Sequence, residues 1–316
     1  MELPKGSNAG VQARRQRLAQ LLLLATAMVW GSTFVLVKAG LNDASPLLFN
    51  LIRMTLAAIA LAIVNLRALR TLTRRQIAGG CSAGVLLAIG YQFQTFGLTL
   101  TTPAKSGFLT GLVVVFVPLL MLVPALRAPG TKRPGLLAGL GAALAFAGLL
   151  LLTTPAGTRV GELFAAIGLG DLMTLVCAVA FAGHMLTLSR VSPHVPAGVL
   201  ATLQIAACAM LMLLSLPLER HPRLHLTPAL LLAFAVTSLF ATAAAFTIQS
   251  FAQKHLPATQ TAVILTLEPV FAWLTSLLFL HDHLGARGGF GAALILAAIL
   301  LIEVGPGLFH TTEIPA

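Results

Sequence analysis

The chain has 316 residues, of which 58% are hydrophobic and only 9% are charged. Soluble domains carry roughly 25% charged residues, so 20 Lys and Arg with 9 Asp and Glu cannot cover a water-soluble surface of this size. The composition therefore argues against a soluble enzyme, a nucleic-acid-binding protein and a disordered protein. The net charge of +11 is better interpreted through the positions of the basic residues around a membrane.

Ten apolar stretches are long enough to cross a bilayer, which requires about 20 residues per helix. Separators containing Pro, Gly or charged residues lie between them. The first stretch follows Arg14, Arg15 and Arg17 and partly resembles a cleavable signal, but it continues to Val37, so we predict a retained helix. The predicted spans are 18–38, 46–66, 76–97, 104–126, 134–153, 169–189, 197–217, 228–251, 258–280 and 286–304.

The distribution of Lys and Arg predicts the orientation of these spans. With the N-terminus in the cytoplasm, the cytoplasmic loops of the first half hold most of the basic residues, as the positive-inside rule requires. An even number of spans then places the C-terminus on the same side. The loops are short and contain no glycosylation sequon, so we predict a multi-pass protein of a bacterial inner membrane with both termini cytoplasmic.

The two halves of the chain show a weak internal repeat. A shift of 155 residues places Gln94 on Gln249 and aligns residues 94–122 with residues 249–277 without a gap. Five spans per half is an odd number, so the halves face opposite ways, as in many secondary transporters. We predict a basic segment at 1–17, a first repeat at 18–153, a connecting loop at 154–168, a second repeat at 169–304 and a cytoplasmic tail at 305–316.

Several short motifs occur in a characteristic order along the chain. They are Trp30-Gly31-Ser32-Thr33-Phe34, Asn50-Leu51-Ile52-Arg53, Tyr91-Gln92-Phe93-Gln94, Lys105-Ser106-Gly107-Phe108-Leu109-Thr110 and Leu267-Glu268-Pro269-Val270-Phe271. In order and spacing they resemble the EamA-like branch of the drug/metabolite transporter superfamily. The resemblance covers residues 15–304. It implies an all-α membrane protein with ten transmembrane helices in two inverted-topology five-helix repeats. It further implies a central cavity lined by spans 1, 3, 4, 6, 8 and 9 and the transport of small metabolites, often outward.

Glu268 is the carboxylate that lies well inside a span, and it precedes Pro269, which predicts a kink. Either it stabilises this kink through hydrogen bonds, or it carries a proton or binds a substrate amine. His184 in span 6 is a second candidate proton carrier, with a packing role as the alternative. Arg53 in span 2 either makes a packing or lipid head-group contact, or pairs with a substrate carboxylate or with an acidic side chain.

Other polar and aromatic side chains inside the spans complete a candidate substrate site. An amide in hydrocarbon needs a partner on another helix or on a ligand, and Gln94 and Gln249 are related by the repeat. Small and hydroxyl residues on spans 4 and 9 alternatively allow close helix packing. The candidate substrate-binding residues are Trp30, Ser32, Thr33, Tyr91, Gln94, Ser106, Thr110, His184, Gln249, Glu268 and Trp273.

Other chemistries find little support in the sequence. There is no GxxxxGK[ST] motif for ATP hydrolysis, and His281, Asp282 and His283 in one short loop do not form a closed metal site. Cys81, Cys177 and Cys208 lie far apart in apolar stretches and indicate packing rather than disulfides. We therefore predict no catalytic residues, no cofactor and no metal.

The function predicted from the sequence is secondary-active transport of a small metabolite such as an amino acid, most simply export, by alternating access around a midplane cavity. Its partners are the metabolite, the lipid bilayer and, as a coupling ion, the proton; nucleic acid is not expected. A passive channel or facilitator is the alternative, and an integral-membrane lipid-modifying enzyme is a weaker one, because the 9 acidic residues are scattered along the chain.

Overall fold

The computed structural model describes residues 6–127, 135–153, 167–219, 221–256, 261, 264, 265 and 267–303. Residues 1–5 of the predicted basic segment, residues 154–166 of the predicted connecting loop and the predicted tail at 305–316 lie outside these residues. In the described part of the chain every regular element is helical, and one isolated antiparallel bridge joins Ala44 to Leu224. The predicted all-α class is thereby confirmed.

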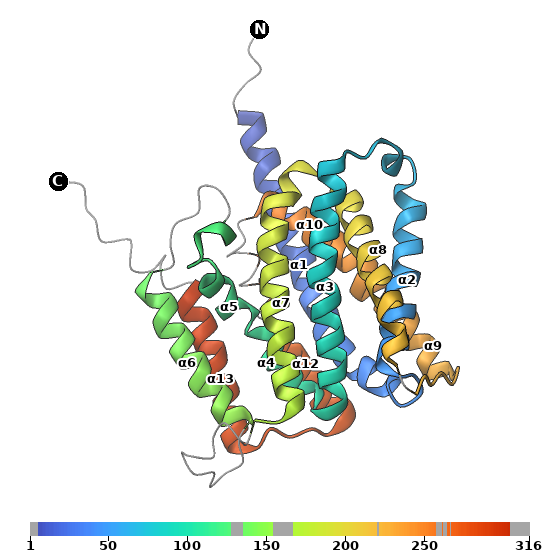
Figure 1. Cartoon of the computed structure of the whole chain (residues 1–316). Helices are drawn as coiled ribbons and strands as arrows, with labels where there is room; N and C mark the ends of the chain where they lie inside the picture. The colour runs from blue at the N-terminus through green and yellow to red at the C-terminus, as the bar shows by residue number, and fades with distance from the viewer. Residues whose placement is uncertain are drawn as a thin grey trace, which may run out of the picture.

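Twelve labelled α-helices carry most of the described chain (Figure 1). They are α1 (Gly6–Gly40), α2 (Pro46–Asn65), α3 (Arg74–Leu100), α4 (Pro103–Gly111), α5 (Val113–Leu120), α6 (Leu136–Thr153), α7 (Leu169–Val191), α8 (Ala197–Ser215), α9 (Pro228–Ala235), α10 (Ala245–His255), α12 (Glu268–Leu280) and α13 (Gly285–Glu303). Short 3-10 helices are η1 (Ala68–Thr71), η2 (Pro124–Leu126), η4 (Ser192–His194) and η5 (Leu216–Leu218), and η6 (Val236–Ala244) is a π-helix that joins α9 to α10.

The length and hydropathy of these helices establish a multi-pass membrane protein. Seven helical stretches in the described residues are long and apolar enough to cross a membrane: Gln12–Gly40, Pro46–Asn65, Arg74–Leu100, Pro103–Leu120, Leu169–His194, Ala197–Leu218 and Pro228–His255. Shorter apolar helices, Gly139–Leu152, Glu268–Leu280 and Gly285–Ala298, occupy the other three predicted spans. The count of ten spanning helices therefore stays a prediction.

Sharp helix starts are encoded by Thr-Pro pairs. Pro is favoured in the first turn of a helix, because its missing N–H has no intrahelical acceptor to lose. The hydroxyl of Thr102 accepts a hydrogen bond from the N–H of Lys105 at 3.3 Å at the start of α4. Thr227 caps α9 in the same way, accepting from Leu230 N at 3.1 Å. Each cap thereby satisfies one backbone N–H at the start of its helix.

The two halves of the chain interleave in the bundle. From the first half, α1 packs against α10 and α12; from the second half, α7 packs against α3, α4 and α5. The pair α2 and α8 lies on one side, and the pair α6 and α13 lies on the other (right and left in Figure 1). Gly148 and Gly291 let α6 and α13 approach closely, because a Cβ at either glycine would lie 2.6 Å from the other's carbonyl oxygen.

Polar contacts tie the two halves together at the end of the bundle drawn lowest in Figure 1. The turn after α1 pairs with the segment before α9: Ser45 N donates to Arg223 O, and His225 N donates to Asp43 O, both at 2.8 Å. At the same end, the chain between α3 and α4 lies beside the start of α7. We call the pairing of residues 43–45 with residues 223–225 the lower clasp.

Candidate functional site

Two helices are interrupted inside the bundle. Helix α4 ends at Gly111 and α5 begins at Val113, with a tightened turn at Leu112, whose N–H donates to Leu109 O at 3.2 Å. The predicted continuous span at 104–126 is therefore two helices meeting at a break. Backbone groups at such a break lack the regular α-helical partners, which is tolerated at membrane depth only inside protein or beside a cavity.

The second interruption precedes α12, which begins at Glu268 directly after Leu267. The sequence predicted a kink at Pro269 within a span from 258 to 280, whereas in the structure Pro269 lies in the first turn of α12. The physical reason is that proline fits the start of a helix better than its interior. Glu268 thus lies at a helix N-terminus, where a carboxylate is favoured by the helix dipole.

The two interruptions fall at corresponding positions of the chain. The shift of 155 residues that aligns Gln94 with Gln249 also aligns Leu112 with Leu267 and Val113 with Glu268. These aligned residues are the ones at which α5 and α12 begin. Helices broken at matching positions of two halves are typical of the binding sites of secondary transporters.

Both breaks border one cavity of about 80 Å³. Its walls come from α1, α3, α4, α5, α7 and α10 and from the chain at Leu265 and Glu268, with one residue from α2. The lining residues are Trp30, Thr33, Phe34, Val37, Arg53, Leu87, Tyr91, Gln94, Thr95, Leu98, Thr110, Gly111, Val113, Val114, Phe181, His184, Met185, Phe246, Gln249, Leu265 and Glu268.

The lining itself follows the internal repeat. Several lining residues of the first half are separated by 155 positions from lining residues of the second half. These pairs are Tyr91 with Phe246, Gln94 with Gln249, Thr110 with Leu265, and Val113 with Glu268. The cavity therefore lies where equivalent parts of the two halves face each other.

Aromatic rings form one wall of the cavity, around Phe246. Its ring centroid lies 5.4 Å from that of Trp30, 6.1 Å from that of Tyr91 and 5.8 Å from that of His184. Such separations are favourable for tilted and edge-to-face ring pairs. Tyr91 also packs edge-on against Phe181, at 5.3 Å.

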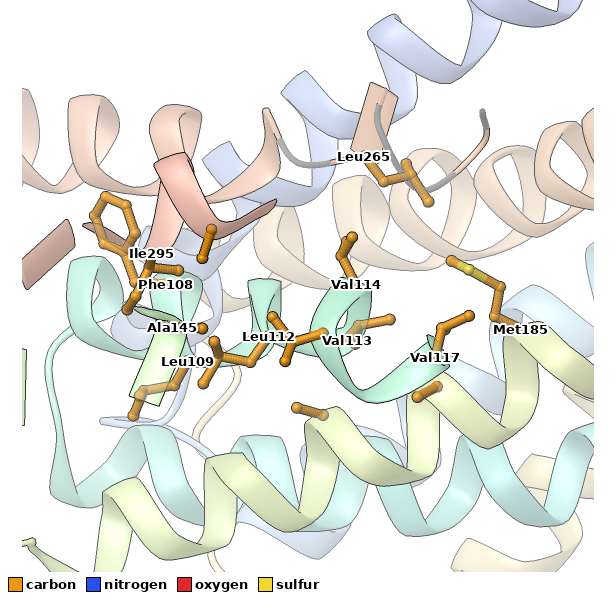
Figure 2. Close-up of a cluster of buried hydrophobic side chains, with 14 of the residues drawn as sticks. Phe108, Leu109, Leu112, Val113, Val114, Val117, Ala145, Met185, Leu265 and Ile295 are labelled. Carbon is orange, nitrogen blue, oxygen red and sulfur yellow. The ribbon is translucent and has the colours of Figure 1, made fainter. Parts of the chain in front are cut away.

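An aliphatic wall faces the break between α4 and α5. Figure 2 shows Val113 and Val114 from α5, Met185 from α7 and Leu265 reaching toward one another from separate elements. All four also belong to the largest buried hydrophobic cluster of the described residues. This packing holds the broken segments in place by burial of apolar side chains.

Polar side chains are few but are held in definite positions. Gln94 Nε2 donates to the hydroxyl of Thr110 at 3.2 Å, which joins α3 to α4. Gln249 is 3% exposed, and its Oε1 has no hydrogen-bond partner among the described residues. The ring of His184 is buried, with Nε2 at 2.7 Å from Gln204 Oε1.

Glu268 is half-buried at the wall of the cavity. In the described part of the chain, no residue forms a hydrogen bond or an ion pair with the carboxylate of Glu268. The ion pair among the described residues joins two other side chains, Lys105 and Asp171, at 3.0 Å. The structure places Glu268 at the cavity wall, and its role as a proton carrier or as a partner of a substrate amine stays a prediction.

Arg53 is the cation of the cavity wall, and it is 3% exposed. Its guanidinium carbon lies 4.6 Å from the centre of the Tyr91 ring, and its Nη2 lies 3.4 Å from the Tyr91 hydroxyl. Its Nε donates to the hydroxyl of Thr242 at 2.9 Å. Arg53 thus lies at the cavity wall and contacts neighbouring helical elements, and its pairing with a carboxylate stays a prediction.

The π-helix η6 connects to the site through side chains. A π-turn bonds residues five apart, and here Thr242 donates its hydroxyl to Thr237 O at 2.7 Å. Trp30 Nε1 donates to Ala241 O at 2.8 Å, so this carbonyl is taken by α1. Interruptions of α-helices by π-type turns occur frequently at functional sites, and no pattern in the sequence indicated the π-helix η6.

Of the predicted substrate-binding residues, Ser32, Ser106 and Trp273 do not line this cavity. Ser106 is fully buried, and its hydroxyl has no partner in the structure, while Trp273 is 36% exposed on α12. Trp30, Thr33, Tyr91, Gln94, Thr110, His184, Gln249 and Glu268 do line it. Phe181 and Phe246 were not predicted, because phenylalanines in an apolar span carry no distinguishing signal.

Comparison with known proteins agrees with this architecture. The EamA-like transporter family matches the chain twice, at residues 17–154 and 168–304. An uncharacterized transporter of Archaeoglobus fulgidus is 30% identical over 297 residues, which is 93% of this chain and 89% of that protein. The uncharacterized transporter YoaV of Bacillus subtilis is 22% identical over 286 residues, covering 88% of this chain and 94% of that protein.

A solved structure titled only "Crystal structure of protein" has the same fold, with a TM-score of 0.67 and 19% sequence identity. The match covers 93% of this chain and 99% of that one. At this level of identity the likeness concerns the fold alone.

Proposed function

The chain belongs to the EamA-like transporter family, and from this premise we propose that it is a secondary-active exporter of small metabolites such as amino acids. In this proposal ten helices form two inverted repeats of five, and the protein lies in a bacterial inner membrane with both termini in the cytoplasm. The transported metabolite, the surrounding lipid and the proton are its partners.

The observation that carries the proposal is the position of the cavity. It lies where α5 and α12 begin, at residues related by the internal repeat, and its walls include matched residues from both halves. Rocking one half against the other would expose such a cavity to each side in turn. Gly107, Gly111 and Gly31 allow this region to pack closely, because a Cβ at each would lie 2.5 Å from an atom of α12.

The lower clasp supports a gate at one end. In the predicted orientation this end faces away from the cytoplasm, and the clasp joins residues 43–45 to residues 223–225 across the two halves. A water molecule fills about 10–15 Å³ of a cavity, so a space of about 80 Å³ is narrow for a metabolite. We infer that the cavity widens when the helices move apart to admit the solute.

Glu268 and His184 are the proposed proton-coupling residues. Both line the cavity, and a carboxylate without a described partner is free to exchange a proton or to bind an ammonium group. The ring of His184 already shares a hydrogen bond with Gln204. Glu268 is therefore the better candidate for the residue that carries the coupled proton.

The test is counterflow in proteoliposomes that contain the purified protein. A panel of labelled amino acids, organic acids, amines and sugars is offered to vesicles preloaded with the same unlabelled solute, with and without an imposed pH gradient. Saturable accumulation supports a carrier. A conductance in planar bilayers without counterflow would instead establish the channel alternative.

A further inference from the structure

A buried cation in a membrane protein usually has an acidic partner, and Arg53 has no such partner among the described residues. Placing Arg at the centre of a spanning helix is costly, and such residues usually pair with an acidic group or face a water-filled cavity. Arg53 lies at the cavity wall and is 3% exposed. No carboxylate of the described residues lies within ion-pair distance of it, since the ion pair found among them is Lys105 with Asp171.

The hydrogen bonds of Arg53 leave donors for a ligand. A guanidinium has five N–H donors and no acceptor. Here Nε donates to the Thr242 hydroxyl and Nη2 lies near the Tyr91 hydroxyl, and both of these acceptors are neutral. Within the described part of the chain, Nη1 has no acceptor at all. Two neutral hydroxyls do not compensate a full positive charge.

The guanidinium is also held in one orientation. Its central carbon lies over the ring of Tyr91 on α3. Thr242 of the π-helix accepts the Nε proton of Arg53 and donates its own hydroxyl proton to Thr237 O. Trp30 fixes the same π-helix through Ala241 O. A guanidinium fixed in this way loses little entropy when it binds a planar anion through two parallel hydrogen bonds.

We propose that Arg53, positioned by Tyr91 and Thr242, is a subsite for the carboxylate group of the transported solute. This inference rests on the proposed function. A carboxylate fits better than a doubly charged phosphate, because among the described residues that line the cavity Arg53 is the one Lys or Arg, and Glu268 adds a carboxylate. Glu268 in turn offers a partner for an ammonium group. A solute with one carboxylate and one ammonium group, such as a free amino acid, would satisfy both charges.

The test compares solutes that differ only in the carboxylate. Counterflow is measured on the full chain in proteoliposomes with an amino acid that the panel identifies, with its C-terminal amide, and with the corresponding amine that lacks the carboxyl carbon. Hydrogen bonds to a charged group change binding by roughly ten- to a hundredfold. We expect the wild type to prefer the amino acid over its amide by such a factor.

Two variants and a control assign this preference to Arg53. Arg53→Gln should move amino acid and amide at similar, low rates. Arg53→Lys keeps the charge but loses the planar guanidinium and its paired donors, so it should retain part of the preference for the amino acid. This variant replaces Arg53→Gln in the comparison if the Gln variant does not fold. Arg70→Gln, on the exposed loop between α2 and α3, is the matched control and should behave as wild type.

Three results would overturn the carboxylate subsite at Arg53. Equal transport of amino acid and amide by the wild type overturns the subsite while leaving the carrier function intact. A preference that persists unchanged in both Arg53 variants also overturns it. If no solute of the panel shows counterflow, the proposed function fails and the subsite fails with it.

Discussion

Val113 and Glu268 each begin a helix, α5 and α12, and both line the central cavity, although 155 positions separate them in the chain. Val113 is 9% exposed and belongs to the buried core, whereas Glu268 is half-buried and has no described partner. The two repeats therefore place a helix start at the cavity from each half of the chain, but only the second carries a carboxyl group there, that of Glu268. This asymmetry is where we place proton coupling.

Replacing Glu268 with Gln removes the carboxyl while keeping its size. If Glu268 carries the coupled proton, Glu268→Gln loses the acceleration that an imposed pH gradient gives to transport, because an amide does not titrate in this range. Exchange without a gradient should continue, with a weaker apparent affinity for a solute whose ammonium group pairs with Glu268. The measurement is gradient-driven uptake against counterflow in the same vesicles.

Glu219→Gln is the control for this experiment. The carboxylate of Glu219 accepts from Leu47 N at 3.3 Å near the lower end of the bundle, and an amide oxygen can accept the same hydrogen bond. It should retain gradient-driven transport. If Glu268→Gln also retains the full effect of the gradient, Glu268 is not the coupling residue.

Close packing of α1 on α12 depends on Gly31. A Cβ at this position would lie 2.5 Å from Glu268 O and 2.8 Å from Ala272 N, which are backbone atoms that cannot turn away. Overpacking typically costs about 1–3 kcal/mol. Gly31→Val should therefore lower the melting temperature of the detergent-solubilised protein, and reduce transport, because the start of α12 is displaced.

The matched control for Gly31 is Gly139 on α6, where an added Cβ would meet nothing within 4 Å. Gly139→Ala should leave the melting temperature unchanged or raise it, since Ala favours a helix by about 1 kcal/mol over Gly. Equal melting temperatures for Gly31→Val and the wild type would contradict the tight contact between α1 and α12.

Trp30 links α1 to the π-helix through a single hydrogen bond, from its Nε1 to Ala241 O. Trp30→Phe keeps an aromatic ring beside Phe246 but removes the donor. A hydrogen bond of this kind contributes about 1 kcal/mol. If it holds the cavity wall in the shape that binds solute, its loss weakens the apparent affinity by at most about fivefold. Counterflow measured over a range of solute concentrations checks this, and Trp273→Phe, outside the cavity, should show no change.

The lower clasp can be locked to test alternating access. Ala44 and Leu224 face each other in an antiparallel bridge, where two Cβ atoms come near the separation that a disulfide needs. With the exposed Cys81 replaced by Ser, the pair Ala44→Cys and Leu224→Cys should stop transport when oxidised and regain it on reduction. Each single cysteine variant is the control. Undiminished transport by the oxidised pair would show that this end does not open.

The elements that the sequence predicted well are those with a strong physical signal. Long apolar runs predict the spans, because a bilayer demands about 20 such residues, and the paired glutamines indicated the matching faces of α3 and α10. Gln94 and Gln249 do line the cavity.

Other features depend on contacts that a single sequence does not reveal. Pro269 predicted a kink, but whether proline bends a helix or begins one is decided by packing, and Gly107 and Gly111 of α4 pack against this part of α12. The contact of Arg53 with Thr242 joins residues that are 189 positions apart in the chain. Ser106, chosen for its face on span 4, is fully buried and lies outside the cavity lining, whereas Thr110, one turn later on α4, lines it.

The most direct test of the whole account is solute protection of a cysteine at the break between α4 and α5. In a protein whose Cys81, Cys177 and Cys208 are replaced, Val113→Cys is reacted with a small thiol reagent at increasing concentrations of a solute that shows counterflow. The account predicts that the solute slows labelling, with half-protection at the concentration that half-saturates transport. Labelling that stays unchanged at saturating solute would contradict a binding site in this cavity.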